Sequence, residues 1–146
     1  MKRATGDRGT VAMFTTIFAV FVIALAGLVV DGGLTIHARQ RAADIAEQAA
    51  RFAAQDIDIN ALRTAPAGSS PVINVADCDA RVKEFAAQSG LSDNDIANSY
   101  CTHTAPDRVD VTVQLTYQPI LTGFFYNHAI VVHGTAAAES LTGPAN

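Results

Sequence analysis

Two cysteines and four histidines are the residues of this 146-residue chain best suited to nucleophilic or metal chemistry. Cys78 and Cys101 are too far apart for a CxxC redox motif. An even pair in an otherwise cysteine-free chain is typical of a structural disulfide in an oxidising compartment; the alternative is two buried free thiols. We therefore predict a Cys78–Cys101 disulfide.

The histidines show no catalytic or metal-ligating pattern. None has HExxH spacing, and neither cysteine has a histidine three or four residues after it. Cys101 and His103 would share one face of a strand, but an oxidised cysteine cannot act as a nucleophile. Of the four histidines, His37, His103, His128 and His133, we interpret the last two as surface or sheet residues and not as ligands.

The segment Asp93–Asn98, DNDIAN, begins like a calcium-binding loop. It has Asn98 where such loops need glycine and Thr104 where they need glutamate, so we interpret it as an acidic turn. The chain also lacks a P-loop and a GxGxxG motif. These patterns predict a protein that is not an enzyme and that has no cofactor, no metal and no evident small-molecule substrate.

Charge is distributed unevenly along the chain. Residues 1–30 carry Lys2, Arg3 and Arg8 against Asp7, a net charge of +2, whereas the rest carries seven basic and thirteen acidic residues, a net charge of −6. An acidic body without a basic cluster argues against nucleic-acid binding, which requires Lys and Arg on phosphates.

The run from Val11 to Val30 contains twenty residues without a charge. As a helix it would be about 30 Å long, the thickness of the hydrocarbon core of a bilayer. Three basic residues precede the run and two, Arg39 and Arg41, follow it closely. This bias predicts a single-pass helix in the cell membrane, with a cytoplasmic N-terminus and an extracellular C-terminal domain.

A cleaved signal peptide is the alternative interpretation of the same run. Ala24-Leu25-Ala26 forms an A-x-A site before Gly27, after a basic segment and an apolar one. The apolar run continues to Val30, so cleavage there would leave an apolar N-terminus, and we favour a permanent anchor. A stripe of small residues with a spacing of seven is a candidate helix-packing surface: Ala12, Ala19, Ala26 and Gly33.

Beyond the apolar run the helical pattern continues to about residue 55. Ala38, Ala42, Ile45, Ala49 and Phe52 form an apolar face, and an outward i,i+4 ion pair is expected between positions 47 and 51. We predict one long helix over residues 10–55, with a flexible point at Gly32-Gly33, because glycine weakens a helix by about 1 kcal/mol relative to alanine.

The remaining residues predict a small head. Residues 63–71 have the composition of a loop. Asp77 is expected to cap a helix over Cys78–Ser89 that ends at Gly90, and a turn then leads into a strand near residues 99–104. Strict alternation predicts a strand over residues 108–117 with one buried face and one solvent-exposed face, the latter including Gln114. A further strand follows over residues 128–139. Between these two strands, Phe124 and Phe125 could cap the core or contact the bilayer or a partner.

These elements predict an α+β fold in which a long N-terminal transmembrane helix continues into an external spine packed on a small antiparallel sheet. We expect a cytoplasmic tail over residues 1–10, a transmembrane helix over 11–30, an external spine over 31–56 and a disulfide-linked head over 57–146.

The stretch from Arg8 to Ala54 resembles the N-terminal region of TadE/TadG-like proteins, pseudopilin-type components of tight-adherence (Flp, type IV-like) pili. The resemblance lies in Arg8-Gly9-Thr10-Val11-Ala12, in Val30-Asp31-Gly32-Gly33, and in Ala38-Arg39-Gln40-Arg41 with the alanine-rich helix after it. It covers about a third of the chain, and the composition suggests an actinobacterial source.

The resemblance implies a pilin-like fold and a minor or accessory subunit of pilus assembly. Its partners would be the lipid bilayer and other pilin-like subunits or proteins of the assembly platform. Gly9-Thr10 is then a candidate processing junction, but the fifth residue counted from Thr10 is Phe14, where processed prepilins carry glutamate. This departure favours the uncleaved, TadG-like type. The alternative function is a secreted or anchored extracellular binding module with a cleaved signal peptide.

Overall fold

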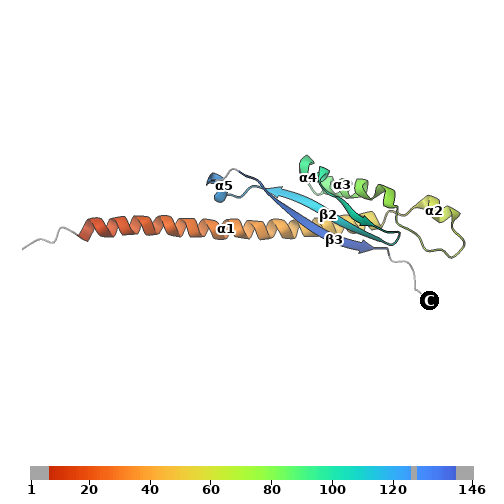
Figure 1. Cartoon of the computed structure of the whole chain (residues 1–146), viewed down its shortest axis with the longest axis horizontal. Coiled ribbons are helices and arrows are strands. Elements are labelled where there is room, and N and C mark those ends of the chain that lie inside the picture. The colour runs from red at the N-terminus through yellow and green to blue at the C-terminus, as the bar shows by residue number, and fades with distance from the viewer. Residues whose placement is uncertain (1–6, 126–127, 141–146) are drawn as a thin grey trace, which may run out of the picture.

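The computed structural model describes residues 7–125 and 128–140, without the side chains of residues 7, 8, 124 and 125. Its elements are α1 (Asp7–Ala54), α2 (Ile59–Thr64), the 3-10 helix η1 (Val75–Asp77), α3 (Cys78–Gln88), α4 (Asp93–Ala97), β1 (Tyr100–Thr104), β2 (Arg108–Tyr117), α5 (Thr122–Phe125) and β3 (Ile130–Glu139). The predicted α+β fold is confirmed: one long helix carries a small antiparallel sheet at its C-terminal half (Figure 1).

Helix α1 contains 48 residues and is therefore about 70 Å long. The predicted flexible point is not seen, because α1 continues through Gly32 and Gly33 without a break. The head holds the helix on both sides of this pair, through the side chains of Asp31 and Thr35. The weak helix propensity of two glycines is thus outweighed by tertiary contacts.

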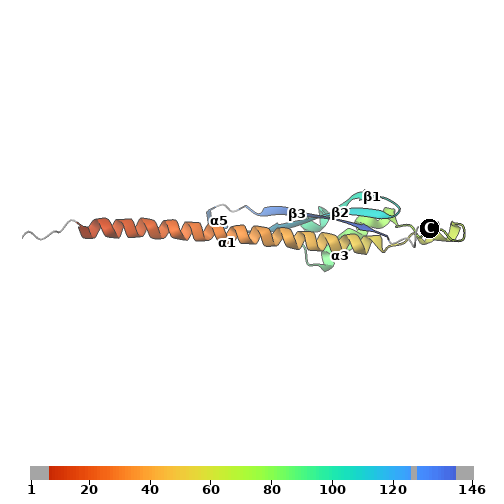
Figure 2. The same ribbon diagram turned by 90° about the horizontal axis from the view of Figure 1, so that it is seen from below.

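The three strands form an antiparallel sheet in the order β1-β2-β3, and the sheet lies along one side of α1 (Figure 2). The predicted alternation in β2 is seen on its inner face, where four apolar side chains are buried against α1 and α3: Val109, Val111, Val113 and Leu115. The facing side of α1 is rich in alanine, as predicted, with Ala42 and Ala49 completely buried. Small side chains allow the helix to lie close to the strands.

The closest approach of helix and sheet is at Gly134 of β3. This residue pairs with Val113, and a Cβ atom added to it would lie 2.2 Å from the backbone C and O atoms of Ala42. A glycine within a strand usually weakens it, and here it marks a close backbone approach. Gly134 therefore sets the distance between α1 and the sheet.

The prediction that Cys101 and His103 share a face is wrong. A β-bulge lies between them, so Cys101 pairs with Val111 while His103 pairs with the adjacent Asp110. Residues opposite each other in an antiparallel pair share a face, and neighbours along a strand do not. The extra residue, Thr102, thus turns Cys101 towards the core and His103 away from it.

The prediction of a simple acidic turn before β1 is also wrong, because residues 93–97 form helix α4. Its Asp95 is 3% exposed and accepts hydrogen bonds from Thr116 and from the side chain of Gln114, which is itself buried. The backbone N–H of Gln114 donates to Ser99 Oγ. The Asp95 carboxylate and Ser99 Oγ thus accept from the edge of β2 beyond the end of β1. The face of β2 that was predicted to be solvent-exposed is therefore partly covered.

Burial raises the pKa of the Asp95 carboxyl, but hydrogen bonds from Thr116, Ser92 and Gln114 together outweigh it, and the pKa lies below the ordinary 3.8. The carboxylate is therefore ionised at neutral pH. This is the charge state that accepts from several donors at once. The acidic side chain thus joins α4 to the edge of β2.

Helix α3 ends as predicted at Gly90, whose φ is +74°. The amides of Gly90 and Leu91 donate to the carbonyls of Ala87 and Ala86, the pattern of a Schellman cap. Its N-terminus differs from the prediction: the side chain of Asp77 makes no capping hydrogen bond, because its carboxylate accepts from Asn74 Nδ2 instead.

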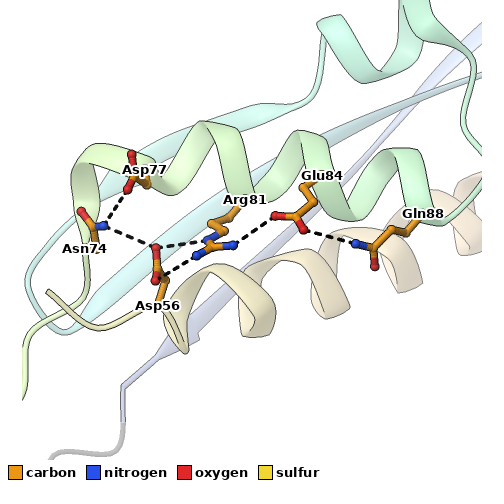
Figure 3. A network of polar contacts seen from close by, with 6 residues as sticks. All are labelled: Asp56, Asn74, Asp77, Arg81, Glu84 and Gln88. Atoms are coloured by element: carbon orange, nitrogen blue, oxygen red, sulfur yellow. Dashed lines mark hydrogen bonds and ion pairs between the residues drawn. The ribbon is translucent and has the colours of Figure 1, made fainter. Parts of the chain in front are cut away.

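A polar network joins α3 to the segment after α1 (Figure 3). Arg81 Nε and Nη2 donate to the two carboxylate oxygens of Asp56, and Arg81 Nη1 donates to Glu84. The same guanidinium lies 5.8 Å from the ring centroid of Phe52. The network therefore fixes α3 across the C-terminal end of α1.

Part of the predicted loop is also helical, since α2 extends to Thr64 with Asp58 as its cap.

The predicted disulfide is present and joins α3 to β1, with the Cα atoms of Cys78 and Cys101 6.2 Å apart. Closing a loop of this length restricts the unfolded chain and is worth about 3–4 kcal/mol. We expect reduction to lower the melting temperature of the head by at least roughly 12 °C, given about 4–8 °C per kcal/mol for domains of this size.

Thermal unfolding in detergent, with and without a reducing agent, measures this effect. The double variant Cys78→Ala and Cys101→Ala is the control, since its melting temperature should not respond to the reducing agent. Free thiols detected by alkylation of the native protein would contradict the prediction.

Candidate functional site

The N-terminal part of α1 projects alone beyond the head (Figure 1). Every residue from Gly9 to Ala26 is exposed, and the large apolar side chains there have 45–70% of their surface free. Within the described residues, α1 is the helix that is long and apolar enough to cross a membrane. We call this exposed part of α1, Gly9 to Ala26, the bare segment or bare helix. The candidate junction Gly9-Thr10 lies at its start.

The candidate packing stripe lies on a part of α1 that the head does not cover. Ala12, Ala19, Ala26 and Gly33 are all exposed, whereas Gly27, one residue after Ala26, is buried. The stripe is thus free for a contact, and its role as an interface stays a prediction. The side chains of Phe124 and Phe125 lie outside the described residues, although the backbone of both belongs to α5.

The head is attached to α1 at the point where the bare segment ends. Residues 118–122, which we call the junction loop, leave β2 and turn towards the helix. Asp31 Oδ1 accepts from the backbone N–H groups of Ile120 and Leu121 at 3.1 and 3.2 Å, and Oδ2 accepts from that of Thr122 at 2.5 Å. One carboxylate therefore satisfies three consecutive amides.

Asp31 is 6% exposed and remains charged. Hydrogen bonds from Thr122 are the main cause that lowers its pKa from 3.8 to about 2; the amides of Leu121 and Ile120 add to the lowering, and burial opposes it. Hydrogen bonds to the charged form of a carboxyl favour ionisation. The contact is thus maintained by a carboxylate at any pH well above 2.

Two further contacts lie on the same face of α1 as Asp31, one helical turn to each side. Gly27 leaves room for Leu121, whose Cδ1 would lie 3.3 Å from a Cβ atom added there. Thr35 Oγ1 and the Tyr117 hydroxyl form a short hydrogen bond. Residues four apart share a helix face, so we call Gly27, Asp31 and Thr35 the docking face. It joins the end of the bare helix to the head.

The sequence interpretation missed this docking role. It named Asp31 only as part of the resemblance, in Val30-Asp31-Gly32-Gly33. The partners of Asp31 are 89 to 91 residues away along the chain, in a segment with no motif for carboxylate binding. A buried aspartate beside two glycines was therefore not recognisable from local pattern alone.

The described residues contain no group of three or more histidine, cysteine, aspartate or glutamate side chains arranged to hold a metal ion. Acidic side chains that form ion pairs, such as Asp56 with Arg81, join separate elements of the fold. The structure around α1 therefore consists of an exposed apolar helix and a folded head that is attached where the exposed part ends.

A family model, Flp pilus-assembly TadE/G-like, matches residues 9–56. Residues 9–56 are a TadE/G-like segment. It comprises α1 from Gly9 onwards, and so includes the bare helix, the docking face and the alanine-rich part of the core. This segment is therefore similar to a family of Flp pilus-assembly components, which is not a known class of enzyme.

The TadE/G-like segment covers about a third of the chain, and α2 to β3 lie beyond it. Neither the curated proteins nor the solved structures include a match to the chain. The actinobacterial source stays a prediction from the sequence.

Proposed function

We propose that the chain is a membrane-anchored, pilin-like minor or accessory subunit of a tight-adherence pilus assembly, acting through helix–helix and head contacts. The observation that carries this proposal is the continuity of α1. Its first half is bare and apolar, and its second half supplies completely buried alanines to the core of the head. The proposed anchor and the core of the head thus share one continuous helix.

A bare apolar helix of this length needs an apolar environment. Burial of its side chains in lipid or against other helices recovers roughly 25 cal/mol for each Å² removed from water. The basic residues before the run favour a cytoplasmic N-terminus, and the disulfide suits an oxidising compartment for the head. Both point to a head outside the cell membrane.

In this proposal residues 1–10 are cytoplasmic, residues 11–30 span the membrane, and residues 31–56 and 57–146 lie outside. The last two segments share one core, since Ala42 and Ala49 of α1 pack with residues of α3 and the sheet. The spine is therefore part of the head's folding unit. Other pilin-like subunits or platform proteins would meet the bare helix and the outer surface of the head.

A secreted or anchored binding module with a cleaved signal peptide is the second candidate. One observation favours it: Gly27 is the first residue of α1 that the head buries, and it directly follows Ala24-Leu25-Ala26. Cleavage after Ala26 would leave the whole docking face in the mature chain. The head contacts alone thus do not require the residues before Gly27.

The intact mass of the protein extracted from native membranes separates these possibilities. A chain that begins at Met1 supports the uncleaved anchor, and one that begins at Thr10 supports processing at the candidate junction. A chain that begins at Gly27 would overturn the anchor and support the secreted module.

Crosslinking to neighbouring membrane helices tests the packing stripe. We expect Ala19→Leu with Ala26→Leu to reduce crosslinks, because larger side chains hold helices apart. Ala24→Leu makes the same change on the head's side of the helix and is the control, which should retain them. Undiminished crosslinks in the double variant would remove the stripe from the proposal.

A further inference from the structure

The junction loop lies beside the apolar span and not above it. Leu121 packs against Gly27, which is three residues before the last apolar residue, Val30. With a rise of about 1.5 Å per residue, this contact is roughly 4–5 Å inside the end of the span. In Figure 1, α5 likewise lies alongside α1, where the bare helix ends. If α1 spans a bilayer, the loop reaches the outer boundary of the hydrocarbon.

The loop presents the apolar side chain of Leu121 at this depth, while Ile120 lies further along α1 and borders the same hollow as Leu34 and His37. Ile120 is 67% exposed and Leu121 is 40% exposed. Leu121 and α1 border a groove of about 350 Å³ lined by Val20, Ile23, Ala24, Gly27, Leu28, Leu121 and Thr122. Thr122, at the docked end of the loop, supplies the one hydroxyl of this lining, and the rest is apolar.

The backbone of the loop is prepared for an apolar environment. Amides that enter lipid without partners cost several kcal/mol each, so irregular segments are excluded from direct lipid contact unless the backbone is satisfied. Here Asp31 accepts from all three amides of residues 120–122. The carboxylate also stays at the end of the span, where polar groups of the interface are close.

The shape of the groove favours a lipid chain over a protein helix. The groove includes Gly27 of the docking face, and the junction loop and the sheet lie along α1 beyond the bare helix (Figure 1). A helix about 10 Å wide running along α1 would collide with the head there. An acyl chain ends at the interface and can fill the groove from below.

We propose that the junction loop is a second membrane contact: Leu121 inserts at the outer leaflet, and a phospholipid acyl chain occupies the groove between the loop and α1. The inference rests on the proposed membrane anchor. Two contacts, the helix and the loop, would fix the tilt and rotation of the head relative to the membrane surface. A single helix leaves the head free to rotate about its axis.

Fluorescence quenching in vesicles of phosphatidylcholine and phosphatidylglycerol tests this. The full chain, with its disulfide intact, carries an environment-sensitive dye at one introduced cysteine. Ile120→Cys reports on the loop, Ile17→Cys on the middle of the span, and Val75→Cys on the far end of the head, where the native side chain is 44% exposed. The quenchers are lipids with a nitroxide near the headgroup or deep in the acyl chain, and aqueous iodide.

We expect the shallow nitroxide to quench the dye at position 120 several-fold more than at position 75, with iodide showing the reverse order. The deep nitroxide should quench position 17. If position 17 is quenched and position 120 behaves like position 75, the loop inference is overturned and the anchor stands. If position 17 is not quenched by lipid, the anchor itself fails.

A third outcome concerns the occupant of the groove. If a dye at Leu121→Cys is shielded from both lipid nitroxides and iodide, and the unlabelled thiol there crosslinks to a second protein, then a protein fills the groove. That result would overturn the proposed acyl chain while leaving the anchor in place.

Discussion

Replacing Gly134 with alanine is expected to lower the melting temperature of the head by more than about 12 °C. The added Cβ atom would lie 2.2 Å from backbone atoms of Ala42 and 2.3 Å from the N atom of Ala43. Backbone cannot move aside as a side chain does, so α1 must separate from the sheet. We expect a cost above the ~1–3 kcal/mol typical of overpacking, at roughly 4–8 °C per kcal/mol.

Local propensity predicts the opposite sign for this substitution. Alanine should stabilise a strand position by about 0.5–1 kcal/mol relative to glycine. The clash is larger, because it separates the alanine-rich face of α1 from Val111 and Val113, the centre of the core. The sign of the measured change therefore decides whether the close approach exists.

Gly32→Ala is the matched control for Gly134→Ala. A Cβ atom at position 32 meets no atom within 4 Å, and the residue is exposed in the middle of α1. We expect it to stabilise the protein by about 1 kcal/mol. Thermal unfolding in detergent, followed by circular dichroism, measures both variants. A Gly134→Ala variant as stable as the parent would contradict the packing of α1 on β3.

Asp31→Asn is expected to release the junction loop from α1. The asparagine side chain has one acceptor oxygen and an NH₂ group that cannot accept, so it cannot satisfy the three amides of residues 120–122. Hydrogen exchange at these three amides should accelerate by orders of magnitude, up to the rate of an open loop. The core of the sheet, including the amides of β2 paired with β3, should keep its protection.

Asp44→Asn is the control for this substitution, because it makes the same change at an exposed position of α1. It should leave exchange at residues 120–122 unchanged. Exchange data from the parent and both variants in detergent would provide the comparison. Retained protection in Asp31→Asn would mean that Gly27 and Thr35 hold the loop without the carboxylate.

The same contact predicts a particular acid response. The pKa of Asp31 is about 2 in the folded protein and 3.8 in an unfolded chain. A lowered folded-state pKa contributes stability that is complete above 3.8 and is lost as the pH falls towards 2. The amide resonances of residues 120–122 should therefore stay in their docked positions at pH 4 and shift only below about pH 3. A midpoint near 4 would contradict the three-amide contact.

The sequence predicted those elements whose pattern is local. Twenty apolar residues in succession, and then alanines at helical spacing, indicate one long helix whatever the rest of the chain does. The alternation in residues 108–117 indicates a strand equally directly, and the two cysteines, Cys78 and Cys101, indicate a disulfide. The helix and the strand form because one face is buried, which depends on residues close together in the sequence. The disulfide forms between the only two cysteines, so its pairing has no alternative.

Other features depended on partners far away in the chain. Gln114 appeared to belong to the wet face of β2, but α4 brings Asp95 over it. One extra residue, Thr102, placed Cys101 and His103 on opposite faces. A bulge or a buried hydrogen bond changes the direction of a side chain without altering the hydrophobic pattern, so periodicity could not predict either.

The candidate site also combines features that the local sequence predicts with features that depend on distant residues. The sequence by itself determined that an apolar helix leads into an alanine-rich spine, because hydrophobicity and helix period are properties of consecutive residues. Only the tertiary structure decided that Asp31 binds the amides of residues 120–122 and that Gly134 meets Ala42. Both contacts join segments about 90 residues apart, and their energy depends on distances that exist only once the helix and sheet have packed.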